Sequence, residues 1–201
     1  MKDGDAGQTR EARVWDVGVR LFHWLLVAFV SASWLLGQFG PAIMTLHFQS
    51  GYVIIGLLAF RLIWGLAGPR PARFASFLAG PRAVWAYART LPRRAPSFWP
   101  GHNPLGGWAV AAMLLLLAAQ VATGLFADPE DFINQGPLAA SVEPATRHWA
   151  SAWHARLATA LLALVILHVA VIAFYRFWKR EDLVRPMLTG RKTVRRDEAD
   201  P

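Results

Sequence analysis

The sequence predicts an all-α integral membrane protein, a four-helix bundle. Of its 201 residues, 55% are hydrophobic, the apolar residues form long runs, and the basic residues gather between these runs. Because a bilayer has about 30 Å of hydrocarbon, a helix needs roughly 20 apolar residues to cross it. Four stretches reach that length, approximately 19–38, 44–66, 106–126 and 153–175. We therefore expect one membrane domain of four transmembrane helices over 19–192.

Polar segments flank the expected membrane domain. Residues 1–18 are a charged head without the small-residue cleavage site that follows the apolar core of a signal peptide. Residues 193–201 are mostly charged and are expected to form a disordered tail. Between the second and third spans, residues 70–100 mix Pro and Arg with aromatic side chains. This pattern favours short amphipathic helices along the membrane interface, and a disordered basic linker is the alternative.

The basic residues predict the orientation. All but three of the 21 Lys and Arg residues lie at the N-terminal end through Arg20, between the second and third spans, or from residue 176 onward. The segment between the third and fourth spans is acidic instead, with Asp128, Glu130, Asp131 and Glu143 against Arg147. By the positive-inside rule, both termini are cytoplasmic. The net charge of +8 then faces anionic lipid headgroups, and we expect no nucleic-acid partner.

Cysteine is absent from the sequence. Disulfides, thiolate metal sites, iron-sulfur clusters and c-type haem attachment all use cysteine sulfur, so none of them is expected. Any redox cofactor must be held by other ligands.

Four of the six histidines, His23, His47, His154 and His168, fall within the expected spans. Ionisable residues are costly in hydrocarbon and are functional there by default. His154 and His168 are fourteen residues apart, so they project from nearly one helix face with about 21 Å between them along the axis. His23 is expected at the depth of His168 near the cytoplasm, and His47 at the depth of His154 near the outer surface.

Each pair at matching depth offers two neutral imidazoles as axial ligands of one low-spin haem b between helices. The sequence therefore predicts two haems b, with pairs His23/His168 on the cytoplasmic side and His47/His154 on the outer side. The alternatives are buried histidines bonded within the protein and a metal-ion pathway. Residues 17–127 contain no Asp or Glu, so three spans lack the carboxylates that a hard-cation or proton pathway uses.

Three further residues are expected near the haems. Gly51 is one helical turn from His47, where a missing side chain lets a macrocycle or another helix approach. Arg61 is expected at the depth of the cytoplasmic pair, and Arg156 follows His154 on the outer side. Either guanidinium is suited to a haem propionate, and snorkelling to lipid phosphates is the alternative for both.

The motifs around these residues resemble the bacterial di-haem cytochrome b561 family, which includes the cytochrome b subunits of nickel-iron hydrogenases. The resemblance covers about residues 14–192 and implies that the four histidines of the spans are haem ligands. It rests on Val19-Arg20-Leu21-Phe22-His23-Trp24, Leu46-His47, Gly51-Tyr52, Phe60-Arg61-Leu62-Ile63-Trp64-Gly65, Gly101-His102-Asn103-Pro104-Leu105-Gly106, Thr123-Gly124-Leu125-Phe126, Trp153-His154, His168 and Met187-Leu188-Thr189-Gly190-Arg191-Lys192.

Three positions need separate comment. Ala155 stands where relatives often have Glu, which puts a proton-handling role there in doubt. His102 opens the third span, outside the two pairs, and we interpret it as structural, with the wall of a quinone pocket as the alternative. His148 lies beside Trp149 in the outer segment and is expected to be plainly exposed, with contact to a partner as the alternative.

The leading functional hypothesis is a subunit of the bacterial inner membrane that passes electrons between the quinone pool and a partner redox protein. The quinone would be ubiquinone or menaquinone, and the partner a c-type cytochrome or a dehydrogenase subunit. The sequence shows no soluble catalytic domain, nucleotide motif or nucleophile constellation, so substrate chemistry is expected on another polypeptide. Such a partner would dock on the acidic, Trp-containing segment 127–153. A homodimer is also compatible with the sequence.

Two other functions stay open. The first is a stand-alone superoxide:quinone oxidoreductase, which would need a cationic approach to the outer haem, where only Arg147 and Arg156 are available. The second is a haem or metal-ion permease. The sequence does not decide where a quinone pocket lies. Its wall is formed either by residues near the cytoplasmic haem (Arg20, Trp64, His102) or by residues near the outer haem (Trp153, Arg156).

Overall fold

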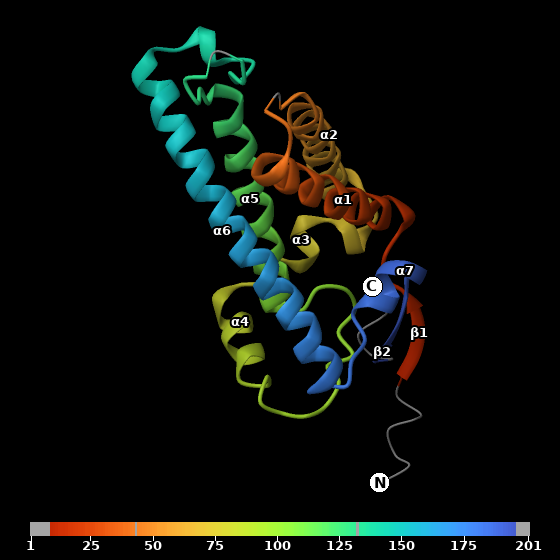
Figure 1. Ribbon diagram of the computed structural model, residues 1–201. Coiled ribbons are helices and arrows are strands. Elements are labelled where there is room, and N and C mark those ends of the chain that lie inside the picture. The colour runs from red at the N-terminus through yellow and green to blue at the C-terminus, as the bar shows by residue number, and fades with distance from the viewer. Residues whose placement is uncertain (1–8, 43, 132, 196–201) are drawn as a thin grey trace. The chain divides into compact units, whose positions relative to one another are not determined.

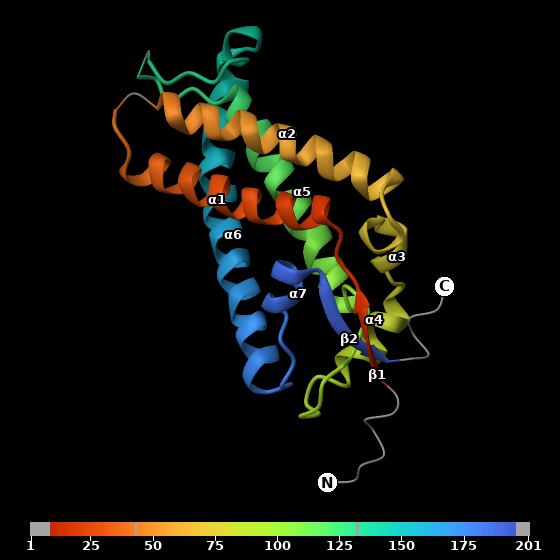
Figure 2. The ribbon, with the colours of Figure 1, turned by 90° about the vertical axis from the view of Figure 1, so that its right-hand side faces the viewer.

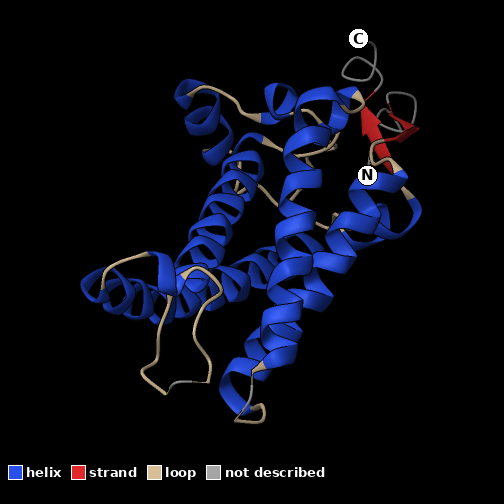
Figure 3. Ribbon diagram, turned by 90° about the horizontal axis from the view of Figure 1, so that it is seen from above, coloured by secondary structure: helices blue, strands red, loops and turns tan. Residues whose placement is uncertain are grey.

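The computed structural model describes residues 9–42, 44–131 and 133–195. Helices make up most of this part of the chain, and the two strands that it contains are short (Figures 1 and 3). In chain order the elements are β1 (Thr9–Arg13), α1 (Val17–Phe39), α2 (Thr45–Ala67), the 3₁₀ turn η1 (Arg70–Ala72), α3 (Phe74–Phe77), α4 (Pro81–Ala88), α5 (Pro104–Phe126), the 3₁₀ turn η2 (Ala139–Ser141), α6 (Pro144–Phe177), α7 (Val184–Thr189) and β2 (Arg191–Arg195).

Within the described residues, α1, α2, α5 and α6 are long and apolar enough to cross a membrane. The predicted fold class, an all-α membrane protein with four spanning helices, is confirmed. Large apolar side chains on these helices, such as Leu21, Ile63, Leu115 and Ile166, are more than half exposed. Exposed apolar area of this extent fits a lipid environment rather than water.

Helix α6 starts earlier than the hydropathy indicates. It begins at Pro144, whereas the apolar run predicts a start near residue 153. Its 34 residues make a helix of about 51 Å, which is longer than the hydrocarbon thickness. Hydropathy missed the first turns because residues 144–152 include the polar side chains of Arg147, His148 and Ser151, which a helix tolerates outside hydrocarbon.

The described chain divides into two compact units. Unit 1 contains the described residues through Leu21, then Arg61–Ala111, and those from Leu167 onward; unit 2 contains Phe22–Phe60 and Ala112–Ile166. In unit 2 the core is formed by Ile54 of α2, Leu117 of α5 and Leu161 of α6, with Leu26, Phe29 and Val30 of α1 packed against it. All four long helices therefore contribute to the unit-2 core.

Strands β1 and β2 of unit 1 pair antiparallel, with Arg13 opposite Arg191 and Thr9 opposite Arg195 (Figure 2). Val194 of β2 is fully buried with Val14, Trp15 and Val19, next to the start of α1. Gly190, with φ of +81°, lets α7 end and turn into β2, and its carbonyl accepts hydrogen bonds from the backbone of Val14 and Trp15.

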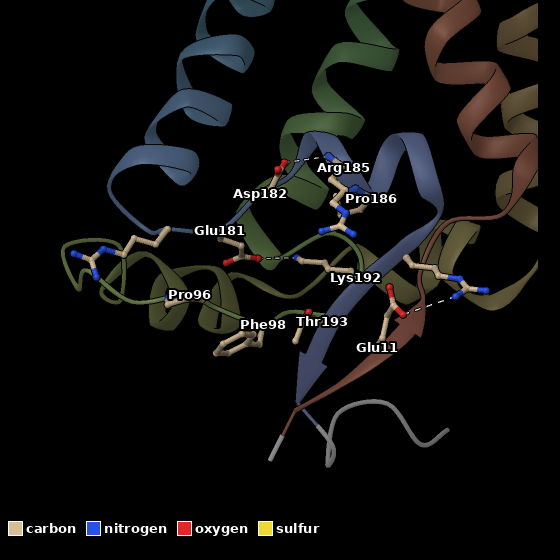
Figure 4. Close-up of a pocket in the computed structure, with 11 residues that line it drawn as sticks. Glu11, Pro96, Phe98, Glu181, Asp182, Arg185, Pro186, Lys192 and Thr193 are labelled. Atoms are coloured by element: carbon tan, nitrogen blue, oxygen red, sulfur yellow. Dashed lines mark hydrogen bonds and ion pairs between the residues drawn. The ribbon is translucent and has the colours of Figure 1, made fainter. Parts of the chain in front are cut away.

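The predicted disorder of the tail is wrong for residues 193–195, which belong to β2; residues 196–201 lie outside the described residues. A buried ion pair anchors this segment, with Lys192 Nζ 2.7 Å from Glu181 Oε1 (Figure 4). Lys192 also donates to the Trp99 carbonyl, and the backbone N–H and hydroxyl of Ser97 donate to Glu181. Composition alone could not reveal this anchor, because its partners are far apart in sequence.

The charge of Glu181 is stabilised by these same contacts. Burial alone would raise the pKa of this carboxyl, but the Lys192 ammonium and the hydrogen bonds from Lys192 and Ser97 hold it below its ordinary value. Breaking one side of such a buried pair is costly because it leaves an uncompensated charge.

The basic segment between α2 and α5 folds into η1, α3 and α4, all within unit 1. The prediction of short helices over 70–100, rather than a disordered linker, is confirmed for residues 70–88. The Tyr87 hydroxyl of α4 lies 2.8 Å from the Tyr175 hydroxyl at the end of α6, and both rings are buried. These contacts make the segment part of the packed unit.

Candidate haem sites

His47 lies in the first turn of α2, and helix α1 orients its ring. The Nδ1 of His47 donates a hydrogen bond of 2.8 Å to the Ser33 carbonyl, with the Ser33 hydroxyl 3.3 Å from the same nitrogen. Because a carbonyl only accepts hydrogen bonds, Nδ1 carries a proton, and in the neutral ring Nε2 therefore has the lone pair. Metal-binding histidines use this arrangement, in which the second ring nitrogen donates to a backbone carbonyl.

His154 of α6 is oriented in the same way by helix α5. Its Nδ1 donates to the Gln120 carbonyl at 2.9 Å. Its Nε2 lies 3.2 Å from the side-chain amide nitrogen of Gln120, which can donate to the free lone pair. That lone pair serves either this amide or a metal ion, but not both. The Oε1 atom of Gln120 is buried and has no hydrogen-bond partner among the described residues.

The two rings are neighbours within unit 2. The centroids of the His47 and His154 imidazoles are 6.2 Å apart, and the ring planes are 83° apart. A metal–imidazole bond is about 2 Å long, so two imidazoles on opposite sides of one metal ion have ring centres roughly 6 Å apart. The spacing and the donor set therefore fit two imidazoles that would hold one iron between them.

A cavity of about 850 Å³ contains both rings. This volume lies within the range of roughly 300–1,000 Å³ that cofactor sites have. Its walls are mainly apolar and come from all four long helices, including Val30, Ile54, Leu117 and Leu161. Such walls suit a flat, largely apolar macrocycle.

Glycines make room beside the rings. Gly51 lines the cavity, and an added Cβ there would meet nothing within 4 Å. At Gly37 a Cβ would lie 3.3 Å from the His47 ring, and at Gly124 it would lie 2.8 Å from Cε1 of His154. The sequence pointed to Gly51, but it gave no role to Gly37 or Gly124. Both are glycines inside expected spans, and Gly124 also belongs to one of the family motifs, but plain helix packing explains a glycine at either position equally well.

Comparison with known proteins assigns the chain to a family. The profile of the family described as prokaryotic cytochrome b561 matches residues 14–190. The chain belongs to this family. Among curated proteins, the "Probable Ni/Fe-hydrogenase B-type cytochrome subunit" of Azotobacter chroococcum mcd 1 is 24% identical, over 93% of this chain and 90% of the relative. No solved structure matches. This cytochrome b561 is thus a multi-pass membrane cytochrome b that takes part in electron transfer and binds b-type haem.

The other two candidate ligands of this cytochrome b561 fall in different units. His23 is in the unit-2 part of α1, with its ring 5.0 Å from that of Trp24. His168 is half-buried in the unit-1 part of α6. Their pairing stays a prediction.

The two arginines have different surroundings in this cytochrome b561. Arg61 is 3% exposed and donates to the Ala72 carbonyl at 3.0 Å, and its guanidinium lies over Phe74 at 4.7 Å. This burial does not agree with snorkelling to lipid phosphates. Arg156 is exposed and stacks on Trp153 at 5.5 Å. Contact of either residue with a haem propionate stays a prediction.

The two remaining histidines that the sequence singled out lie outside the cavity. The His102 ring packs between Trp15 at 4.6 Å and Phe77 at 4.9 Å, which agrees with the structural interpretation. The His148 side chain is 80% exposed and lies 3.8 Å from the Glu130 carboxylate. It is thus on the surface, as expected.

Proposed function

We propose that this cytochrome b561 binds two haems b and passes electrons between the quinone pool and a partner redox protein. The paired His47 and His154 rings, held by carbonyls inside one cavity, carry the proposal. The second haem would use His23 and His168. When bound, haem b supplies an iron that is reversibly reduced by one electron.

The protein's own groups prepare the His47/His154 site. The carbonyls of Ser33 and Gln120 orient both rings and select, for the neutral imidazole, the tautomer whose Nε2 can bind a metal ion. The apolar walls lower the local dielectric constant, which disfavours extra charge and so tunes the reduction potential.

The spacing along α6 supports a path for electrons. His154 and His168 are fourteen residues apart on one continuous helix, which corresponds to about 21 Å. Two haems at these levels would cover most of the roughly 30 Å of hydrocarbon. Following the positive-inside rule, we place both termini in the cytoplasm, His168 near that side, and the chain in the bacterial inner membrane.

A redox partner would meet the acidic segment 127–153, near the His47/His154 cavity. The relative from Azotobacter chroococcum is named as a hydrogenase subunit, which favours a dehydrogenase-type partner for this chain. The exposed rings of Trp149 and Trp153 are suited to an interface. The superoxide alternative needs cationic side chains near the outer haem, and only Arg147 and Arg156 are available there. It is weaker because the Arg147 guanidinium lies 3.6 Å from the Asp128 carboxylate, which compensates its charge.

Electron exchange with quinones tests the proposed function. One quinol carries two electrons and releases two protons on oxidation, so it can reduce two haems by one electron each. Oxidised protein in proteoliposomes is mixed with menadiol or ubiquinol-1, and reduction of the haem is followed by its α band. In the reverse experiment, protein reduced by dithionite is mixed with the matching quinones, and reoxidation is followed in the same way. We expect exchange with at least one couple. Haem that dithionite reduces but that neither couple reduces or reoxidises would contradict the role of quinone.

A further inference from the structure

Asn134 joins two loops of unit 2 that are far apart in the sequence. Its side-chain amide donates to the Ala42 carbonyl at 2.7 Å, and its Oδ1 accepts from the backbone N–H of Met44 at 2.9 Å. Asn134 is 7% exposed. Asn134 thereby connects the segment between α5 and α6 to the turn between α1 and α2. The ribbons of these two segments lie close to one another in Figure 2. A surface loop that served only as a link would not need this buried contact.

Asp131 fixes the orientation of the Asn134 amide. The Asp131 carboxylate accepts from the backbone N–H of Asn134 at 2.8 Å and from its side-chain amide at 2.6 Å. These bonds, with a third from the Ile133 N–H, hold the pKa of Asp131 below its ordinary value. At neutral pH the ionised carboxylate therefore keeps the Asn134 side chain in place.

On one side, Asn134 holds the start of the helix that carries His47. Met44 immediately precedes α2, and its carbonyl accepts the N–H of Phe48 at 3.0 Å. His47 follows Met44 by three residues, less than one helical turn. The N–H of Met44 is one of the orphan donors of a helix start, so the Asn134 oxygen acts as a cap from another part of the chain.

On the other side, the segment of Asn134 rests on the end of α5 (Figure 1). Gly136 donates to the Ala127 carbonyl at 2.7 Å, and Leu138 donates to the Leu125 carbonyl at 2.9 Å. A Cβ at Gly136 would lie 2.6 Å from the Gly124 carbonyl. Gly124 in turn faces the His154 ring. Contacts therefore run from Asn134 to both candidate ligands.

We propose that Asn134 is a positioning residue of the His47/His154 haem site, where it fixes the start of α2 against the end of α5 and so sets the separation of the two imidazoles. The inference rests on the proposed function, since it takes these histidines as axial ligands. Asn134 itself also lines the cavity. Its loss should change the ligand geometry without removing a ligand.

The test compares Asn134→Ala with Glu130→Ala, a change in the same segment at a side chain that is 80% exposed. The readouts are the low-spin electron paramagnetic resonance signals of the oxidised protein, the midpoint potential of each haem, and the rate of haem transfer to apomyoglobin. For Asn134→Ala we expect one haem to change its signal and potential and to leave about tenfold faster, in line with the loss of an outer-shell partner. In these three readouts, none of which involves the partner, Glu130→Ala should match the unchanged protein.

Three outcomes would overturn the inference: no difference between the two variants, an equal change of both haems, or loss of both haems, since the last two indicate general destabilisation. His47→Ala and His154→Ala separate this inference from the proposed function. If each removes one haem while Asn134→Ala has no effect, only the role of Asn134 is wrong. If neither removes a haem, the ligand pair itself is wrong.

Discussion

Replacement of His154 by alanine is expected to remove one of two haems b from the purified protein and to leave the other spectrally unchanged. Nδ1 of His154 donates to the Gln120 carbonyl, which leaves the Nε2 lone pair for a metal ion once the Gln120 amide gives it up. Alanine removes this ligand and leaves His47 alone on the cavity wall. One imidazole cannot keep a six-coordinate low-spin haem, so the haem should be lost or become high-spin. Haem content per chain and the visible spectrum measure the effect.

His148→Ala is the matched control for His154→Ala. His148 lies on the same helix, six residues earlier, but its side chain is 80% exposed and lies near Glu130 rather than in the cavity. It should keep both haems. If His154→Ala retained two low-spin haems, the axial role of His154 would be refuted. Equal losses in both variants would point to damage of α6 in general.

Gly124→Val is expected to have the second-largest effect, because it fills the space that the His154 ring occupies. A Cβ at this position would lie 2.8 Å from Cε1 and 3.0 Å from Nδ1 of His154. The ring cannot simply turn aside, since it would lose its hydrogen bond to the Gln120 carbonyl. We expect the affinity for one haem to fall by tenfold or more, about the effect of disturbing an outer-shell partner, measured by haem titration of the apoprotein.

Gly56→Ala is the control for Gly124→Val, because a Cβ at Gly56 would meet nothing within 4 Å. This variant should bind both haems as the unchanged protein does, although it also replaces a glycine within a spanning helix. Normal haem binding by Gly124→Val would show that the ring position is not critical. A similar fall in both variants would assign the effect to helix propensity rather than to the site.

The long helices and the candidate ligands were predictable because they follow from local patterns. Apolar runs of about 20 residues predict spans, and each of the four coincides with one long helix, with only residue 44 outside it. Helical periodicity and depth also indicated His47 and His154 as neighbours, and their rings are 6.2 Å apart. The depth of a residue in the membrane follows from its position along its helix, so it can be read from the sequence.

The partners of these residues were not predictable in the same way. A backbone carbonyl such as that of Ser33 or Gln120 has no sequence signature, since every residue has one. The contacts of Asn134 join positions about 90 residues apart, and the pairing of β1 with β2 joins the two ends of the described chain. The burial of Arg61 beside Phe74 was not predictable either, because the short helices around it are defined only by packing.

The most direct test of the central claim is the haem content of the detergent-purified, unmodified protein, by pyridine haemochrome and a reduced-minus-oxidised spectrum against protein concentration. Two axial pairs predict two b-type haems per chain, both low-spin and both reversibly reducible. One haem per chain would contradict the second pair, His23 and His168. No stoichiometric haem would contradict the account as a whole and favour a permease.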